Sequence, residues 1–273
     1  MWDKESNLKA YDNIERMSNY KNAEELTKYR NYLLEKSKIQ SDFIKGFFNE
    51  KAKIFEACSG NSRLLYRLYI DDLLQEGKGV EISSSRVNFA EQWKKDFNQA
   101  NIANICEDII EYNIKEQYYN LVICITSAFG YFYPIDETYP SILLDKFKDM
   151  LQKDGYLLLE LYQHPKVIEF CKMDDNKKMK RWIELPEDDP FRFYLTEYTY
   201  HESQNCLEGK EIFIRRDGYI DDSKREIIKI YPYEEIKGIL EGKGFSIEGA
   251  YSDWDKKEYD INADKLIIIA KKN

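Results

Sequence analysis

Histidine is almost absent from this chain: only two of its 273 residues are histidine, and its five cysteines stand singly. No two cysteines have the C-x-x-C spacing that is typical of zinc sites and of thioredoxin-like redox sites. The sequence therefore predicts no metal site. An odd, scattered set of cysteines also favours a reducing compartment, so we expect a cytoplasmic protein.

Long apolar runs and an excess of positive charge are missing too. No apolar stretch approaches the roughly 18 residues that a membrane-spanning helix needs, and the opening residues MWDKESNLKAYD lack the basic and then apolar pattern of a secretion signal. The formal net charge is −9, whereas binding to duplex DNA or to an anionic membrane depends on clustered cations. The charge therefore argues for a small-molecule or protein partner, with neither nucleic acid nor membrane. The oligomeric state stays open, a homodimer included.

Apolar strands alternate with amphipathic helices in much of the chain. The predicted strands are 53–57, 78–83, 102–108, 120–129, 156–161, 244–254 and 264–272, and the predicted helices between them are 62–77, 85–100, 140–155 and 232–243. Two of these helices are expected to end at Gly77 and Gly155. The last two strands are separated only by a polar loop, so we expect them to pair antiparallel at the end of the sheet. This order predicts an α/β fold: a doubly wound, mostly parallel, seven-stranded Rossmann-like sheet.

Two segments lie outside that alternation. Residues 1–50 have helical periodicity and predict a helical N-terminal cover. Residues 163–190 are charged and are expected to be irregular, whereas 191–201, 210–220 and 224–233 read as antiparallel strands. The sequence thus predicts a helical lid over 1–50, a core over 51–161 and 231–273, and an antiparallel β insert over 162–230 that covers the substrate site.

The loop after the first strand, EACSGNS over residues 56–62, contains one glycine. A ligand at the carboxyl ends of such strands needs backbone to come close, which small residues permit. Cys58, Ser59, Gly60 and Ser62 are all small. A dinucleotide needs further glycines so that its phosphates reach the helix N-terminus. The loop therefore favours a ligand without a pyrophosphate.

Acidic residues come at the ends of the first three predicted strands. Glu56 ends the first, Glu81 ends the second 21 residues after Gly60, and Asp108 ends the third. A carboxylate at the second position can accept the hydroxyl groups of a ribose, and one at the third can accept an adenine amino group. Glu107, beside Asp108, is the alternative for that role, or neither residue has it. Three carboxylates around one crevice would repel phosphates, so they favour a ligand with a ribose, an amine and a positive charge.

These segments together resemble class I S-adenosylmethionine-dependent methyltransferases. EACSGNS is similar to the family's acidic residue followed by G-x-G-x-G, and only the middle glycine, Gly60, remains. GVEIS and CEDII are similar to the segments around the ribose and adenine, YYNLVICITSAFGYF to the fourth-strand motif, and LLQKDGYLLLEL to the helix and strand after it. The resemblance implies S-adenosyl-L-methionine as cofactor, bound at Glu56, Ala57, Cys58, Gly60, Glu81, Ile82, Asp108, Ile109 and Thr126. Ile82 and Ile109 would flank the adenine, although both positions also suit ordinary core residues.

Two residues are candidates for the chemistry. Tyr131 follows the fourth strand, where methyl donor and acceptor should meet; an aromatic residue that packs the loop is the alternative. His164 follows the fifth strand and is a candidate general base, which an alcohol or phenol acceptor would need; an ordinary loop histidine is the alternative. His201 lies in a predicted strand and is expected to be structural.

The sequence predicts a methyltransferase that acts on a nitrogen or oxygen of a small molecule. An NAD-type oxidoreductase on a similar sheet is one alternative, because Glu81 would also suit the ribose of NAD. A non-catalytic binding protein that kept the fold is the other. Methylation of nucleic acids is disfavoured by the net charge and by TSAF at residues 126–129, where an N-P-P-Y-type motif would stand.

Overall fold

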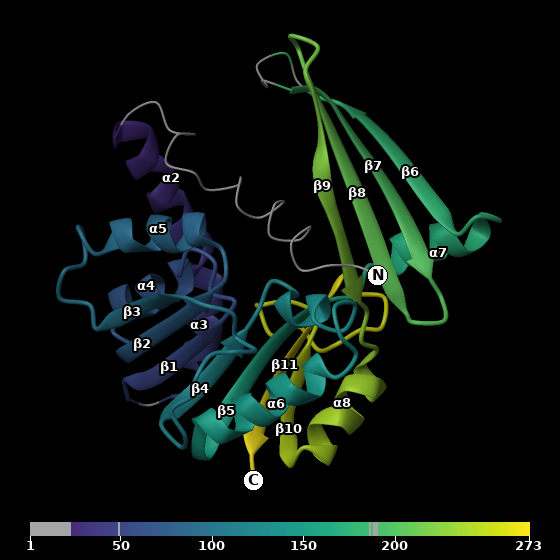
Figure 1. Cartoon of the computed structure of the whole chain (residues 1–273). Helices are drawn as coiled ribbons and strands as arrows, with labels where there is room; N and C mark the ends of the chain where they lie inside the picture. The colour runs from purple at the N-terminus through teal and green to yellow at the C-terminus, as the bar shows by residue number, and fades with distance from the viewer. Residues whose placement is uncertain (1–22, 49, 186, 188–190) are drawn as a thin grey trace.

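Seven strands form one large sheet in the computed structural model, which describes residues 23–48, 50–185, 187 and 191–273 (Figure 1). The strand order is β10-β11-β5-β4-β1-β2-β3. Their bounds are β1 Ala52–Ala57, β2 Leu74–Glu81, β3 Ile102–Cys106, β4 Tyr119–Cys124, β5 Leu151–Tyr162, β10 Phe245–Tyr251 and β11 Lys265–Lys272. Strand β11 pairs antiparallel with β5 and β10, and the pairs from β3 to β5 are parallel. The predicted doubly wound, mostly parallel sheet is confirmed, as is the antiparallel pairing of the last two strands.

Helices cover both faces of this sheet. One face packs against α2 (Ala23–Lys36), α3 (Lys38–Lys45), α4 (Arg63–Ile70) and α5 (Ser84–Trp93), and the other against α6 (Tyr139–Met150) and α8 (Tyr233–Gly242). Successive side chains of a strand point to opposite faces, so Ile54 joins the first core and Phe55 the second, and both are fully buried. The near-continuous apolar runs of the central strands follow from this double burial.

A second sheet holds the β insert and projects from the large sheet (Figure 1). It has the antiparallel order β6-β7-β8-β9, with β6 Lys178–Glu184, β7 Phe191–His201, β8 Cys206–Arg215 and β9 Ile220–Lys229. The expectation that residues 163–190 are irregular was wrong, because this stretch forms α7 (Pro165–Met173) and β6. Strand β6 is charged because it is a mostly exposed edge strand, and charged side chains protect such edges from further pairing.

The two glycine boundaries predicted from the sequence were also wrong. Helix α4 ends before Asp72, whose φ of +61° turns the chain, and β2 already begins at Leu74. Gly77 lies inside β2, where a Cβ would approach the Leu74 side chain to 3.0 Å. Gly155 likewise lies inside β5, which begins directly after α6. In both places an apolar strand follows a helix almost without a loop, so the apolar pattern alone did not mark the junction.

The helical N-terminal cover is present where the structure describes it. Leu33, Leu34 and Phe43 of α2 and α3 are buried against the same core as α4. The predicted helical segment before residue 23 lies outside the described residues, and the division into lid, core and insert stays a prediction. Strand order reverses between β1 and β4, and in sheets of this kind a ligand crevice opens at the carboxyl ends of the two strands that flank that point.

Candidate functional site

A cavity of about 290 Å³ lies at the carboxyl ends of β1, β2 and β4. Glu56 and Glu81 reach it from the ends of β1 and β2, and Asp108 and Thr126 from the loops after β3 and β4. The three acidic side chains therefore border one shared hollow. The predicted site residues that line it are Glu56, Cys58, Gly60, Glu81, Ile82, Asp108, Ile109, Thr126 and Tyr131. Their individual roles stay predictions.

The backbone of the loop after β1 is left-handed at three residues, of which only one is a glycine. Cys58, Gly60 and Ser62 have φ values of +53°, +54° and +57°. The left-handed conformation costs an L-residue about 1–2 kcal/mol, so the loop must be held by its surroundings. The backbone N–H of Ser59 donates to the Val80 carbonyl at 3.1 Å, and that of Ser62 donates to the Ser59 carbonyl at 2.8 Å. The loop thus keeps the shape of a glycine-rich turn with a single glycine.

The carboxylate of Glu81 also holds this loop. Its Oε2 accepts a hydrogen bond from the backbone N–H of Gly60 at 2.8 Å, and its Oε1 accepts one from the backbone N–H of Ser83 at 2.9 Å. The loop packs against β2 at Gly79, because a Cβ added to Gly79 would lie 2.5 Å from the Ser59 Oγ. Glu81 therefore ties the loop to the strand and borders the cavity at the same time.

Glu56 carries a buried carboxylate with an unsatisfied oxygen. The residue is 4% exposed, and its Oε2 has no hydrogen-bond partner among the described residues. The pKa of Glu56 is raised to about 8: burial raises it most, the positive charge of Arg63 lowers it, and the negative charge of Glu81 raises it to a smaller extent. A buried carboxylate of this kind is stabilised by a cationic ligand. An ammonium or sulfonium group in the cavity would fit it.

Arg63 supplies a positive group to the same cavity, and sequence reasoning missed it. It is the first residue of α4, lines the cavity, and donates from Nη1 to the Ser37 Oγ at 2.9 Å. When Glu56 is ionised, it and Arg63 thus offer opposite charges to the hollow. That pair complements a ligand that carries both an ammonium and a carboxylate. A basic residue directly after the small-residue loop was the available sequence signal.

The loop after β4 is held by a second buried acid that the sequence did not reveal. Glu160 is 3% exposed; its Oε2 accepts from the backbone N–H of Thr126 at 2.8 Å, and its Oε1 accepts from the Trp254 Nε1 at 3.1 Å. Thr126 and Ser127 both have positive φ values, +59° and +57°. Glu160 therefore fixes a strained loop that lines the cavity.

The two catalytic candidates are placed differently. Tyr131 ends the short helix η2 (Ala128–Tyr131), lines the cavity, and donates its hydroxyl hydrogen to the Glu226 Oε2 at 2.7 Å. His164 does not line the cavity: it precedes α7, and its ring packs edge-on against Tyr162 at 5.5 Å. Burial lowers the pKa of His164, and the carboxylate of Asp264 counteracts that effect. This placement gives no support to a general base at His164, and that role stays a prediction.

Three further placements complete the description of the site. Ala57 is 1% exposed, packs into the core on the α6 and α8 side, and is not among the residues that line the cavity. Within the described part of the chain, no three His, Cys, Asp or Glu residues are grouped to hold a metal ion. Among the helices that the structure describes, none has the length and hydropathy to cross a bilayer. His201 ends β7, and its Nε2 lies 2.9 Å from the Glu208 Oε2.

Comparison with known proteins identifies the fold. Neither a protein-family model nor a curated protein sequence matches the chain. Among solved structures, the CcbJ methyltransferase from Streptomyces caelestis has a TM-score of 0.73 at 12% identity over 86% of this chain and 89% of its own. An S-adenosylmethionine-dependent methyltransferase from Clostridium acetobutylicum ATCC 824 has 0.69 at 18% identity over 86% and 92%. CalS10 from Micromonospora echinaspora, an amino pentose methyltransferase with S-adenosylmethionine bound, has 0.64 at 12% over 93% and 98%. The fold is that of S-adenosylmethionine-dependent methyltransferases, as the resemblance predicted.

Proposed function

We propose that this protein binds S-adenosylmethionine in the cavity and transfers its methyl group to a nitrogen or oxygen of a small molecule. The observation that carries the proposal is the position of Glu56. An unpartnered buried carboxylate lines the same hollow as Glu81 and the single-glycine loop. The fold of the solved methyltransferases supports the same conclusion, and CalS10, an amino pentose methyltransferase, is an example that acts on a small acceptor.

The lining residues fit each part of such a donor. Glu56 would hold the ammonium of its methionine end and Arg63 its carboxylate, because a zwitterion needs both charges. Glu81 would accept the ribose hydroxyls. Ile82 and Ile109 supply apolar contacts for the adenine. Asp108 accepts a hydrogen bond from the Ile110 N–H at 2.9 Å through Oδ1, which orients its carboxylate in the adenine-side loop.

Bound there, the donor would supply an electrophilic methyl carbon to the acceptor lone pair and would leave as a neutral thioether, and the proton of the acceptor would pass to water. The protein's own contribution is to position both partners and exclude water. Glu160 holds the loop that presents Thr126 to the cavity, and Tyr131 borders the cavity beside that loop. The hydrogen bonds that hold Thr126 and Tyr131 in place do not involve His164.

The two alternatives make different predictions. An NAD-type oxidoreductase would place a pyrophosphate beside the loop, where the carboxylate of Glu81 would repel it and a single glycine, Gly60, permits close approach. A non-catalytic binding protein would bind the donor without transferring its methyl group.

Calorimetric titration with S-adenosylhomocysteine, the demethylated donor, and separately with NAD⁺ tests the proposal. We expect the demethylated donor to bind and NAD⁺ not to bind. Labelled S-adenosylmethionine incubated with small amines and alcohols then tests transfer. Binding of NAD⁺ in place of the demethylated donor would refute the methyltransferase assignment, and donor binding without transfer to any acceptor would favour the binding protein.

A further inference from the structure

The small sheet has two chemically different faces. In β7, the side chains of Tyr194, Thr196 and Tyr198 lie on one face, and those of Glu197 and Thr199 lie on the other, because strand side chains alternate. Residues paired across neighbouring strands lie on the same face, so both faces continue across β8 and β9. We call the face of Glu197 the paired-charge face and the face of Tyr198 the aromatic face.

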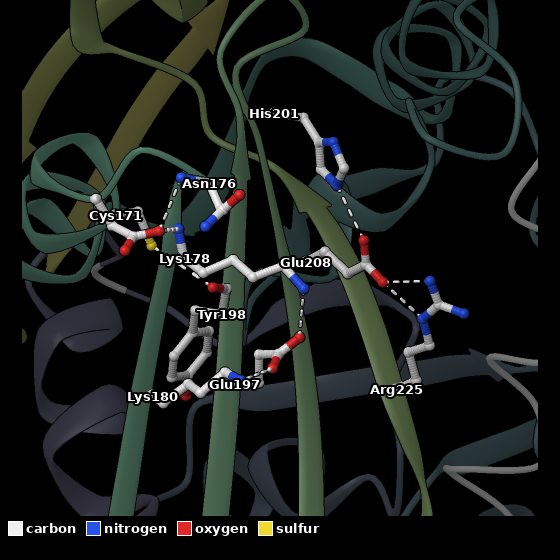
Figure 2. Close-up of polar contacts among 10 residues, drawn as sticks. Cys171, Asn176, Lys178, Lys180, Glu197, Tyr198, His201, Glu208 and Arg225 are labelled. Carbon is white, nitrogen blue, oxygen red and sulfur yellow. Dashed lines mark hydrogen bonds and ion pairs between the residues drawn. The ribbon is translucent and has the colours of Figure 1, made fainter.

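On the paired-charge face the acids are matched by cations. Figure 2 shows Glu197 between Lys178 and Lys180, and Glu208 between His201 and Arg225. The Nζ atoms of Lys178 and Lys180 lie 2.8 and 3.1 Å from the carboxylate oxygens of Glu197. The Arg225 Nε lies 2.6 Å from the Glu208 Oε1. These ion pairs connect neighbouring strands across the face. On this face, both carboxylates are therefore already paired with cations.

On the aromatic face the acids are matched by tyrosines. The Tyr194 hydroxyl donates to the Glu211 Oε1 at 2.7 Å. Tyr198 lies opposite Gly209, which in turn lies opposite Glu226. A Cβ at Gly209 would lie 3.2 Å from the Tyr198 ring and 3.7 Å from the Glu226 Cγ. The missing side chain thus lets the ring and the carboxylate of Glu226 lie close together.

Tyr131 connects this face to the cavity, whose lining residues belong to the large sheet with its helices and loops. The Tyr131 side chain lines the cavity, and its hydroxyl donates to Glu226 at 2.7 Å. The junction between the two sheets is close-packed, since a Cβ at Gly130 would lie 3.0 Å from the Lys229 carbonyl oxygen. Glu226 is therefore joined to a cavity-lining residue through the Tyr131 hydroxyl group.

Two further features describe the polarity of this face, on which Lys224 also lies opposite Glu211. Thr196 is 5% exposed, and its Oγ1 has no hydrogen-bond partner among the described residues. The pKa of Tyr198 is raised by burial and then by the negative charges of Glu211 and Glu226, and Arg181 of the edge strand is the opposing charge. The field at the centre of the face therefore disfavours a further negative charge.

We propose that the aromatic face is the acceptor subsite, and that it takes small molecules with a protonated amine and an apolar or ring-shaped body. The inference rests on the proposed function, and it narrows the acceptor from any nitrogen or oxygen compound to an amine. Carboxylates attract the ammonium, and tyrosine faces add cation–π attraction and contact area. An anionic acceptor would be repelled by the same groups.

Three probes of similar size and different charge test the subsite: benzylamine, benzyl alcohol and benzoate. Each is titrated calorimetrically into the full chain, with and without S-adenosylhomocysteine. We expect benzylamine to bind at least tenfold more tightly than benzyl alcohol, and benzoate to bind most weakly. Equal affinities for the three probes, or no binding of benzylamine, would overturn the inference.

Variants of the two faces provide the matched comparison. Glu226→Gln should weaken benzylamine binding at least tenfold and leave benzyl alcohol and S-adenosylhomocysteine unaffected, whereas Glu208→Gln, on the paired-charge face, should change none of them. Tyr131→Phe, which removes only the hydroxyl donor to Glu226, should keep the preference for the amine. An equal loss in Glu226→Gln and Glu208→Gln would overturn the subsite. Failure of the wild-type chain to bind S-adenosylhomocysteine would instead refute the proposed function, and the probe preference measured without it would still test the face.

Discussion

Replacing Glu56 by glutamine removes one titrating group from the cavity without changing its shape. In the folded protein, burial raises the pKa of Glu56 to about 8, against 4.5 as its ordinary value. Between these two pH values the unfolded chain has lost the proton and the folded chain keeps it. The unfolded state therefore binds fewer protons, and the free energy of unfolding falls as the pH rises from about 4.5 to about 8. One pKa unit corresponds to about 1.4 kcal/mol, so this loss is on the order of 5 kcal/mol across the window.

Glu56→Gln should abolish that part of the pH dependence. Urea unfolding at pH 5, 7 and 9 measures the free energy of unfolding of both proteins. We expect similar stabilities at pH 5, and a variant that is more stable than wild type by a few kcal/mol at pH 9. Glu248→Gln, which changes an exposed acid on the edge strand β10, is the matched control and should follow wild type. Parallel pH profiles for Glu56→Gln and wild type would refute the reasoning.

The same protonation change should accompany ligand binding. At pH 7 a group with a pKa of about 8 is mostly protonated, and an ammonium beside it favours the ionised form. Titration of the demethylated donor in buffers of different ionisation enthalpy should show release of close to one proton from Glu56 in wild type, and no such contribution in Glu56→Gln. Identical proton release in the two proteins would contradict the assignment of Glu56 to the ammonium.

Three other substitutions test the rest of the site. Glu81→Ala should weaken binding of the demethylated donor roughly 10- to 100-fold in calorimetry, because it removes both the ribose contact and the bond to the loop; unchanged affinity would disprove the ribose assignment. Gly79→Ala should lower both the melting temperature and the affinity for the donor, because the added Cβ would enter the loop. Gly238→Ala, in a helix with open space around it, should raise the melting temperature slightly. Equal changes in the two variants would be inconsistent with the packing of the loop against Gly79. His164→Gln should leave the rate of methyl transfer unchanged between pH 6 and 9, and a loss of a hundredfold or more would restore His164 as the general base.

Local pattern predicted the parts of the fold that are buried on both faces. The apolar runs around Ile54 and Leu158 could be placed in strands because such runs between helices have few alternatives. The expectation failed for residues 163–190, since the exposed β6 has no apolar pattern and depends on pairing with β7. It also failed at the start of β2 and β5, where helix and strand are both apolar and meet within a few residues.

The sequence by itself determined which acidic residues stand at the strand ends that border the cavity. Glu56, Glu81 and Asp108 could be placed at one edge because the carboxyl ends of neighbouring parallel strands meet there. Tertiary structure alone decided which distant side chains complete the site. Glu160 reaches Thr126 across 34 residues and Glu226 reaches Tyr131 across 95. No local propensity encodes such contacts: the first needs β4 and β5 to be paired in the large sheet, and the second needs the small sheet to be packed against η2. The ionisation of Glu56 has the same origin, since its pKa is set by burial in the folded chain and by charges that folding brings beside it.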